Sequence, residues 1–77
     1  MKIPMTELKQ AMTIGNEIEL YYKDDQALLE PDYKGGWVLT FTSNPDKEIK
    51  LSGIDEVLDY KVDGSSLFDN LRSYQIY

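Results

Sequence analysis

The chain has 77 residues, of which 14 are acidic and 8 are basic, so its net charge is −6 at pH 7, and it contains neither cysteine nor histidine. The lack of cysteine excludes disulfides and thiolate chemistry, and the lack of histidine removes the commonest general base and metal ligand. The acidic balance argues against direct contact with nucleic acid, because phosphate binding needs clustered Lys and Arg. We therefore expect a single small domain over residues 1–77, with no cofactor and no enzymatic activity.

The sequence contains neither a membrane-spanning segment nor a signal peptide, and these two features bear on the expected cellular compartment. No segment approaches the roughly 20 apolar residues of a membrane span. Residues 1–7 carry one lysine and an early glutamate and lack the apolar stretch of a signal peptide. With no cysteine and no export signal, the sequence predicts a cytoplasmic protein that does not bind membranes.

The first predicted element is a short helix with Thr6 as its N-cap, and Gly15 stands where helices commonly end in a left-handed residue. Pro4 suits an extended lead-in to this helix. The helix presents one apolar stripe at helical spacing, which consists of Met5, Leu8, Ala11 and Met12.

Residues 17–23 then alternate with a period of two, which predicts a strand with one face in water. The predicted buried face carries Ile18, Leu20 and Tyr22, and the opposite face carries Glu17, Glu19, Tyr21 and Lys23. Residues 24–26 break the alternation and predict a turn that lacks the Asn-Gly or Asp-Gly pair typical of tight hairpins.

A second, less regular strand is predicted within residues 27–33. Pro31 disfavours helical geometry at Glu30, so a strand is preferred over a helix here. Because proline cannot donate a backbone hydrogen bond, Pro31 predicts an edge or irregular position in the sheet. Lys34, Gly35 and Gly36 predict a turn.

Residues 37–42 form the clearest predicted strand, rich in aromatic and β-branched side chains. Trp37, Leu39 and Phe41 share its inward face. A turn is predicted at residues 43–46, and residues 48–51 alternate again, so we expect a fourth strand that pairs back antiparallel.

Two short helices and a final strand complete the expected order. Ser52 and Asp55 resemble a capping box at the start of the first helix, and Ser66 and Asp69 repeat this pattern after an Asp63-Gly64 turn. The expected apolar positions are Ile54, Val57 and Leu58 in one helix and Leu67, Phe68 and Leu71 in the other, and residues 73–77 alternate as a strand. The predicted fold class is α+β: an antiparallel sheet of about four to five short strands, with one N-terminal and two C-terminal helices packed on one face.

The acidic groups and the serines offer little chemistry. Asp55 and Asp59 are four residues apart on one helix face, where a weak carboxylate site for a metal ion is an alternative to an ordinary solvated surface. The sequence favours the solvated surface and predicts no metal site. A Ser–Lys dyad of Ser65 or Ser66 with Lys61 is formally possible, but both serines are already explained as helix caps.

The tyrosines are the unexplained part of the composition. There are six in 77 residues, and a core this small cannot bury all of them. Protein interfaces are enriched in tyrosine, while cross-strand packing that merely covers a sheet is an equally good explanation. The candidate partner-binding surface consists of Glu17, Glu19, Tyr21, Tyr74 and Tyr77.

Three segments carry a resemblance to a known group of proteins: Gly15-Asn16-Glu17-Ile18-Glu19-Leu20-Tyr21-Tyr22, Gly36-Trp37 and Asp63-Gly64-Ser65-Ser66-Leu67, followed by a Tyr-rich end. In this order they are similar to short uncharacterised α+β proteins of Gram-positive bacteria and their phages or mobile elements. The resemblance implies a small α+β fold and no known activity. The chain departs from that pattern at Asp24-Asp25-Gln26, where a glycine-containing tight turn is expected.

The sequence therefore predicts a non-catalytic protein-binding or adaptor module that acts through an acidic, Tyr-bearing surface. One alternative is an acidic nucleic-acid mimic that inhibits a DNA- or RNA-binding enzyme. Another is a homo-oligomerising structural domain, such as a homodimer, joined through the strand that contains Pro31 or through residues 73–77 as free sheet edges.

Overall fold

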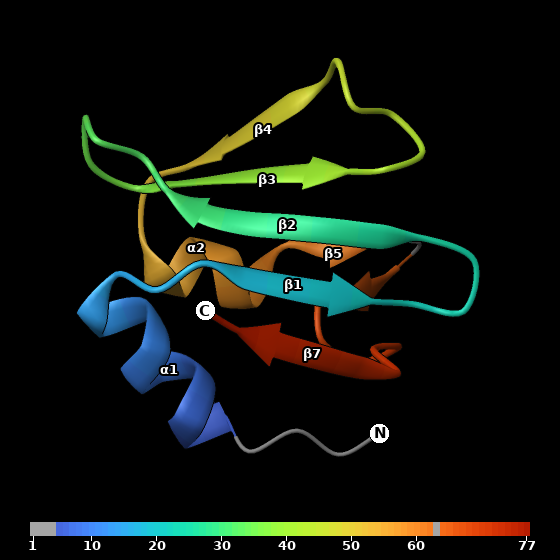
Figure 1. The fold of residues 1–77 in the computed structure, drawn as a ribbon, viewed down its shortest axis with the longest axis horizontal. Helices are drawn as coiled ribbons and strands as arrows, with labels where there is room; N and C mark the ends of the chain where they lie inside the picture. The colour runs from blue at the N-terminus through green and yellow to red at the C-terminus, as the bar shows by residue number, and fades with distance from the viewer. Residues whose placement is uncertain (1–4, 63) are drawn as a thin grey trace.

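The computed structural model describes residues 5–62 and 64–77. Its elements in chain order are α1 (Met5–Ile14), β1 (Ile18–Tyr21), β2 (Gln26–Pro31), β3 (Trp37–Phe41), β4 (Glu48–Leu51), α2 (Ile54–Asp59), β5 (Lys61–Val62), β6 (Ser65–Ser66) and β7 (Ser73–Ile76). Five strands form one antiparallel sheet in the order β4-β3-β2-β1-β7 (Figure 1), and β5 and β6 form a separate two-stranded sheet. The antiparallel sheet with short helices confirms the predicted α+β class.

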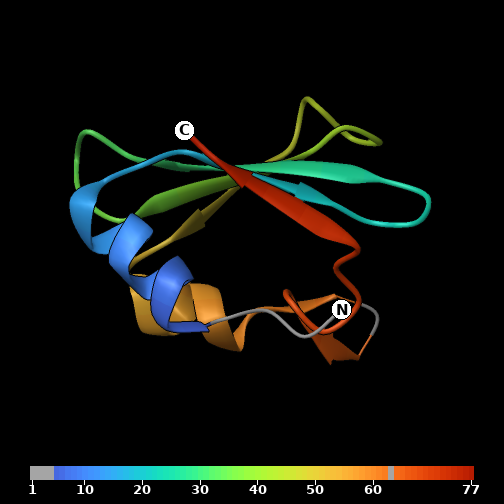
Figure 2. The same cartoon turned by 60° about the horizontal axis from the view of Figure 1, so that its bottom comes forward.

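All of the remaining elements lie on one side of the five-stranded sheet. Figure 2 shows α1, α2 and the β5–β6 pair below it. We call this side the covered face and the other side the open face, over which no described element packs. The buried side chains form one cluster between the covered face and the helices; its fully buried members include Leu8, Ile18, Leu20, Leu29, Leu39, Val57, Leu67 and Leu71.

The end of α1 follows the sequence prediction, whereas its start does not. Gly15 has φ 95°, and the N–H groups of Gly15 and Asn16 donate to the carbonyls of Met12 (3.0 Å) and Ala11 (2.9 Å). These two bonds satisfy carbonyls that a helix end leaves unpaired. Thr6 lies inside the helix and is therefore not its N-cap. Pro4 lies outside the described residues.

The strand that contains Pro31 is the middle strand of the sheet, so the prediction of an edge position is wrong. Pro31 is the last residue of β2. The pairing of β2 with β1 ends two residues before it, at Leu29, which pairs with the first residue of β1, Ile18. The Thr42 N–H donates to the Gln26 carbonyl (2.7 Å), so even-numbered β2 residues point their backbone groups at β3. The nitrogen of Pro31 therefore points past the end of β1, where no hydrogen bond is lost.

The prediction of two C-terminal helices is also wrong, because only α2 forms. Residues 67–70 make turns, in which the Asp69 N–H donates to the Ser66 carbonyl (3.1 Å) and the Ser66 N–H donates to the Asp69 carboxylate (3.2 Å). The predicted capping contact is thus present without a helix after it. A segment this short cannot offset the cost of helix nucleation and is held instead by its buried Leu67, Phe68 and Leu71.

The start of α2 differs in detail from the predicted capping box. Gly53 is the N-cap and makes no side-chain cap hydrogen bond. The carboxylate of Glu56, rather than that of Asp55, accepts hydrogen bonds from the hydroxyl and the N–H of Ser52. Of the predicted Asp63-Gly64 turn, Asp63 lies outside the described residues, and Gly64 has φ 83°.

Candidate functional site

The alternation of β1 divides its side chains between the two faces of the sheet. Ile18 and Leu20 are fully buried on the covered face, so Glu19 and Tyr21 project from the open face. β7 pairs with β1 in a register that sets Gln75 opposite Glu19 and Ser73 opposite Tyr21. The predicted polar face of this strand therefore lies on the open face, between β2 and the edge strand β7.

The carboxylate of Glu19 accepts hydrogen bonds from three side chains on the open face. Its Oε2 accepts hydrogen bonds from the Tyr21 hydroxyl (2.5 Å) and the Gln26 side-chain amide (2.9 Å), and its Oε1 accepts one from the Tyr77 hydroxyl. We call these four residues the Glu19 cluster. Because Gln26 comes from β2 and Tyr77 follows β7, the cluster joins three adjacent strands.

The hydrogen bonds of the Glu19 cluster shift the pKa values of its members. Bonds from Tyr21, Tyr77 and Gln26 stabilise the ionised carboxylate and lower the pKa of Glu19 below 4.5. The hydrogen bond to Glu19, partial burial and the negative charge raise the pKa of Tyr77 to about 12, and the same carboxylate raises the pKa of Tyr21. At neutral pH the cluster is therefore an ionised carboxylate held by two neutral phenols.

The Glu19→Gln variant is expected to lower the pKa of Tyr77 from about 12 towards its ordinary value of 10.0, because the amide removes the negative charge that keeps the phenol protonated. NMR detection of the tyrosine ring carbons between pH 8 and 13 measures this shift. The Glu7→Gln variant, which removes a carboxylate on the other side of the sheet, is the control. An unchanged Tyr77 titration in Glu19→Gln would show that the cluster does not form.

The same hydrogen bonds determine how Glu19 affects the stability of the fold at low pH. The pKa of Glu19 is lower in the folded chain than the ordinary value of 4.5. Its contribution to stability is therefore present above pH 4.5 and is lost as the pH falls through the folded-state pKa.

The structure brings four of the five predicted surface residues to the open face. Glu17 is exposed there beside the cluster, and its carbonyl accepts a hydrogen bond from the Tyr77 N–H (2.9 Å). Tyr74 does not join them: it pairs with the buried Leu20 on the covered face, and its hydroxyl donates to Glu7 of α1 (3.0 Å). Tyr74 thus helps to hold the helix against the sheet.

A shallow hollow of about 400 Å³ adjoins the Glu19 cluster on the open face. Its lining includes Glu19, Gln26, Leu28, Glu30, Thr40 and Pro45. Sequence reasoning missed Gln26 and Glu30, since it assigned Gln26 to a turn and treated Glu30 only as the neighbour of Pro31. The two-residue spacing of Gln26, Leu28 and Glu30 is the signal that places them on one face of a strand.

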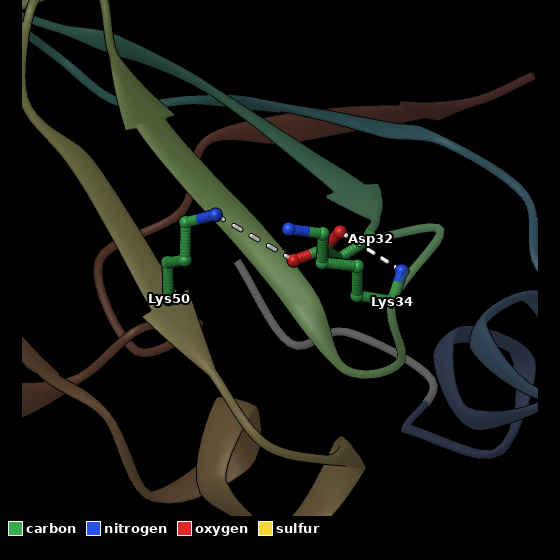
Figure 3. Close-up of polar contacts among 3 residues, drawn as sticks. All are labelled: Asp32, Lys34 and Lys50. Atoms are coloured by element: carbon green, nitrogen blue, oxygen red, sulfur yellow. Dashed lines mark hydrogen bonds and ion pairs between the residues drawn. The ribbon is translucent and has the colours of Figure 1, made fainter.

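A lysine, Lys50, lies near the opposite edge of the open face, on β4. The ammonium of Lys50 on β4 lies 3.7 Å from the carboxylate of Asp32, which also accepts a hydrogen bond from the Lys34 N–H (3.1 Å; Figure 3). Val38 is paired between Glu30 and Lys50 and is only 7% exposed. The long side chains of its neighbours therefore shield an apolar residue that faces away from the core.

The remaining acidic residues and serines of the sequence analysis form no catalytic arrangement among the described residues. The Asp25 carboxylate accepts hydrogen bonds from the Ser43 hydroxyl (2.7 Å) and N–H (3.1 Å), so it ties two turns together and has a lowered pKa. Lys61 stands opposite Ser66 in the β5–β6 pair but is exposed. Within residues 5–62 and 64–77, no group of three or more Asp or Glu residues is arranged to hold a metal ion. Likewise, no helix in that part of the chain has the length and apolar character needed to cross a membrane.

Comparison of the chain with models of protein families, with curated proteins and with solved structures finds no match. The candidate site is therefore interpreted from its own geometry and chemistry.

Proposed function

We propose that the chain is a small cytoplasmic, non-catalytic protein-binding module, and that it docks a cationic surface of a partner protein on its open face. The observation that carries this proposal is the Glu19 cluster, in which an ionised carboxylate and two tyrosine rings are held together on an uncovered sheet. Side chains that are ordered before binding lose less entropy when a partner arrives.

The charge of the open face supports a cationic partner. Glu17, Glu19, Glu30 and Glu48 project from it, whereas Lys50 is already paired with Asp32. Complementary charge speeds encounter and selects partners more than it adds affinity. Glu19 and Glu30 both line the hollow of about 400 Å³. An arginine side chain of the partner fits this lining, because its guanidinium pairs with carboxylates.

The proposal is tested by quantitative affinity capture from lysate of the cells that encode the chain. We expect a partner that the wild type retains, that salt releases, and that the double variant Glu19→Gln, Glu30→Gln loses by about tenfold or more. The matched control is Asp55→Asn, Asp59→Asn, which removes the same charge from the exposed surface of α2, on the other side of the molecule. This control is expected to retain the partner.

Equal recovery of every partner by the two double variants would contradict the proposal, as would the absence of any salt-sensitive partner. A captured nucleic-acid-binding enzyme whose activity is blocked by the wild type, and not by Glu19→Gln, Glu30→Gln, would identify the module as an inhibitor that imitates nucleic acid.

A further inference from the structure

The five-stranded sheet has two edge strands, β4 and β7. On the covered face, Tyr74 of β7 is hydrogen-bonded to α1, which Figure 2 shows below the sheet. At the other edge β4 is the outermost strand, and no described helix extends beyond it. An exposed strand edge offers unpaired backbone groups to another chain. The β4 edge is therefore accessible to another chain.

The backbone register shows which residues of β4 offer these groups. Thr42 donates to Gln26 and Asp32 donates to Gly36, so even-numbered residues of β3 direct their backbone groups to β2 and odd-numbered ones to β4. Leu39, whose backbone N–H and C=O groups point to β4, pairs with Ile49, so the backbone groups of Ile49 point back to β3. The N–H and C=O groups of Glu48 and Lys50 consequently point outwards, away from the sheet.

The side chains of these two residues have opposite charges and share the open face, where the exposed Lys50 ammonium also lies 3.7 Å from the Asp32 carboxylate of its own chain. Glu48 pairs with Thr40 and Lys50 pairs with Val38, and both are exposed. If a second β4 lies antiparallel to the first across a twofold axis at Ile49, Glu48 of each copy stands opposite Lys50 of the other. Both pairs are then favourable cross-strand ion pairs at positions that exchange backbone hydrogen bonds. The same strand is thus complementary to itself.

We propose that two copies of this chain associate through their β4 edges to form one continuous antiparallel sheet. Twofold symmetry requires one surface to match itself, and the Glu48/Lys50 arrangement meets that condition. The proposal differs from the binding of a partner on the open face, since it uses the edge of the sheet.

The covered side of the same edge adds apolar contact. Ile49 is only half-buried, and it lines a hollow of about 200 Å³ together with Phe41, Tyr60 and Val62. With the axis at Ile49, the Ile49 side chains of the two copies meet on this side. The pairing is nevertheless limited to a four-residue strand, so the dimer belongs to the weak class of small interfaces.

The test uses charge variants of the full chain, measured by sedimentation equilibrium up to about 1 mM, a range suited to such weak interfaces. The wild type is expected to show a dimer that increases with concentration and weakens with salt. Glu48→Lys and Lys50→Glu each place like charges opposite one another and are expected to weaken self-association by about tenfold. An equimolar mixture of the two variants restores opposite charges across the interface and is expected to form a heterodimer. The double variant Glu48→Lys, Lys50→Glu restores self-association.

Circular dichroism of each variant establishes that it is folded, and the mixing experiment itself requires folded partners. A wild type that stays monomeric at about 1 mM overturns the proposal. A dimer that persists equally in both single variants overturns it as well, because another surface must then join the copies. Loss of the dimer does not affect capture of a partner by Glu19 and Glu30, so the two proposals fail separately.

Discussion

Replacement of Leu29 by alanine is expected to lower the free energy of unfolding by about 3 kcal/mol, because it removes a fully buried side chain and leaves a cavity. Leu29 lies in the middle strand of the sheet, between Ile18 of β1 and Leu39 of β3, which are both fully buried. Because β2 is paired with a strand on both sides at Leu29, we expect the backbone to close little of the cavity. Urea unfolding followed by circular dichroism measures the loss.

The adjacent residue offers a matched control. Leu28→Ala makes the same chemical change on the open face, where Leu28 is half-buried between Glu19 and Thr40. A partly exposed side chain at the surface is expected to cost about 1 kcal/mol or less. Equal losses in Leu28→Ala and Leu29→Ala would contradict the assigned register, because a slip of one residue exchanges the two faces of a strand.

The second large effect is expected at Gly36, which follows the turn between β2 and β3. Gly36 has φ 83°, a conformation that L-residues rarely adopt. A Cβ added there would overlap the backbone carbonyl oxygen of Leu51 and lie 3.3 Å from the Cα of Ser52. Gly36→Ala is therefore expected to destabilise the chain by about 3 kcal/mol, since backbone strain and a clash with backbone atoms act together. Thermal and urea unfolding measure this change.

The neighbouring Gly35 separates these two causes. It also has positive φ, 99°, but nothing lies within 4 Å of a Cβ built on it. Gly35→Ala therefore carries only the backbone strain, and its expected cost is about 1 kcal/mol. If Gly36→Ala costs no more than Gly35→Ala, then β4 does not approach the turn as closely as the structure describes.

Local sequence patterns predicted the strands whose two faces have different environments. Ile18 and Leu20 alternate with Glu19 and Tyr21, so the period of two also identified which side chains face water. The same alternation placed Glu17, Glu19 and Tyr21 in one row of the candidate surface. Gly15 identified the end of α1, because a left-handed residue after a helix is a local property of the backbone.

The pairing of distant segments could not be read in this way. Nothing within residues 26–31 indicates that β1 and β3 lie on either side of them, so Pro31 suggested an edge although its nitrogen points past the end of β1. Ser66 and Asp69 make the contact of a helix start, but the buried positions of Leu67 and Leu71 hold turns instead of a helix.

The sequence by itself determined the α+β class, the polar row of the first strand and the excess of tyrosine and acidic residues. Each of these depends on composition or on neighbours a few residues apart. The tertiary structure decided that Tyr77 reaches Glu19 while Tyr74 turns to α1, and that Gln26 completes the cluster. It also decided that β4 is an edge strand of the sheet. These outcomes depend on strand order and register, which are set by contacts between residues far apart in the chain.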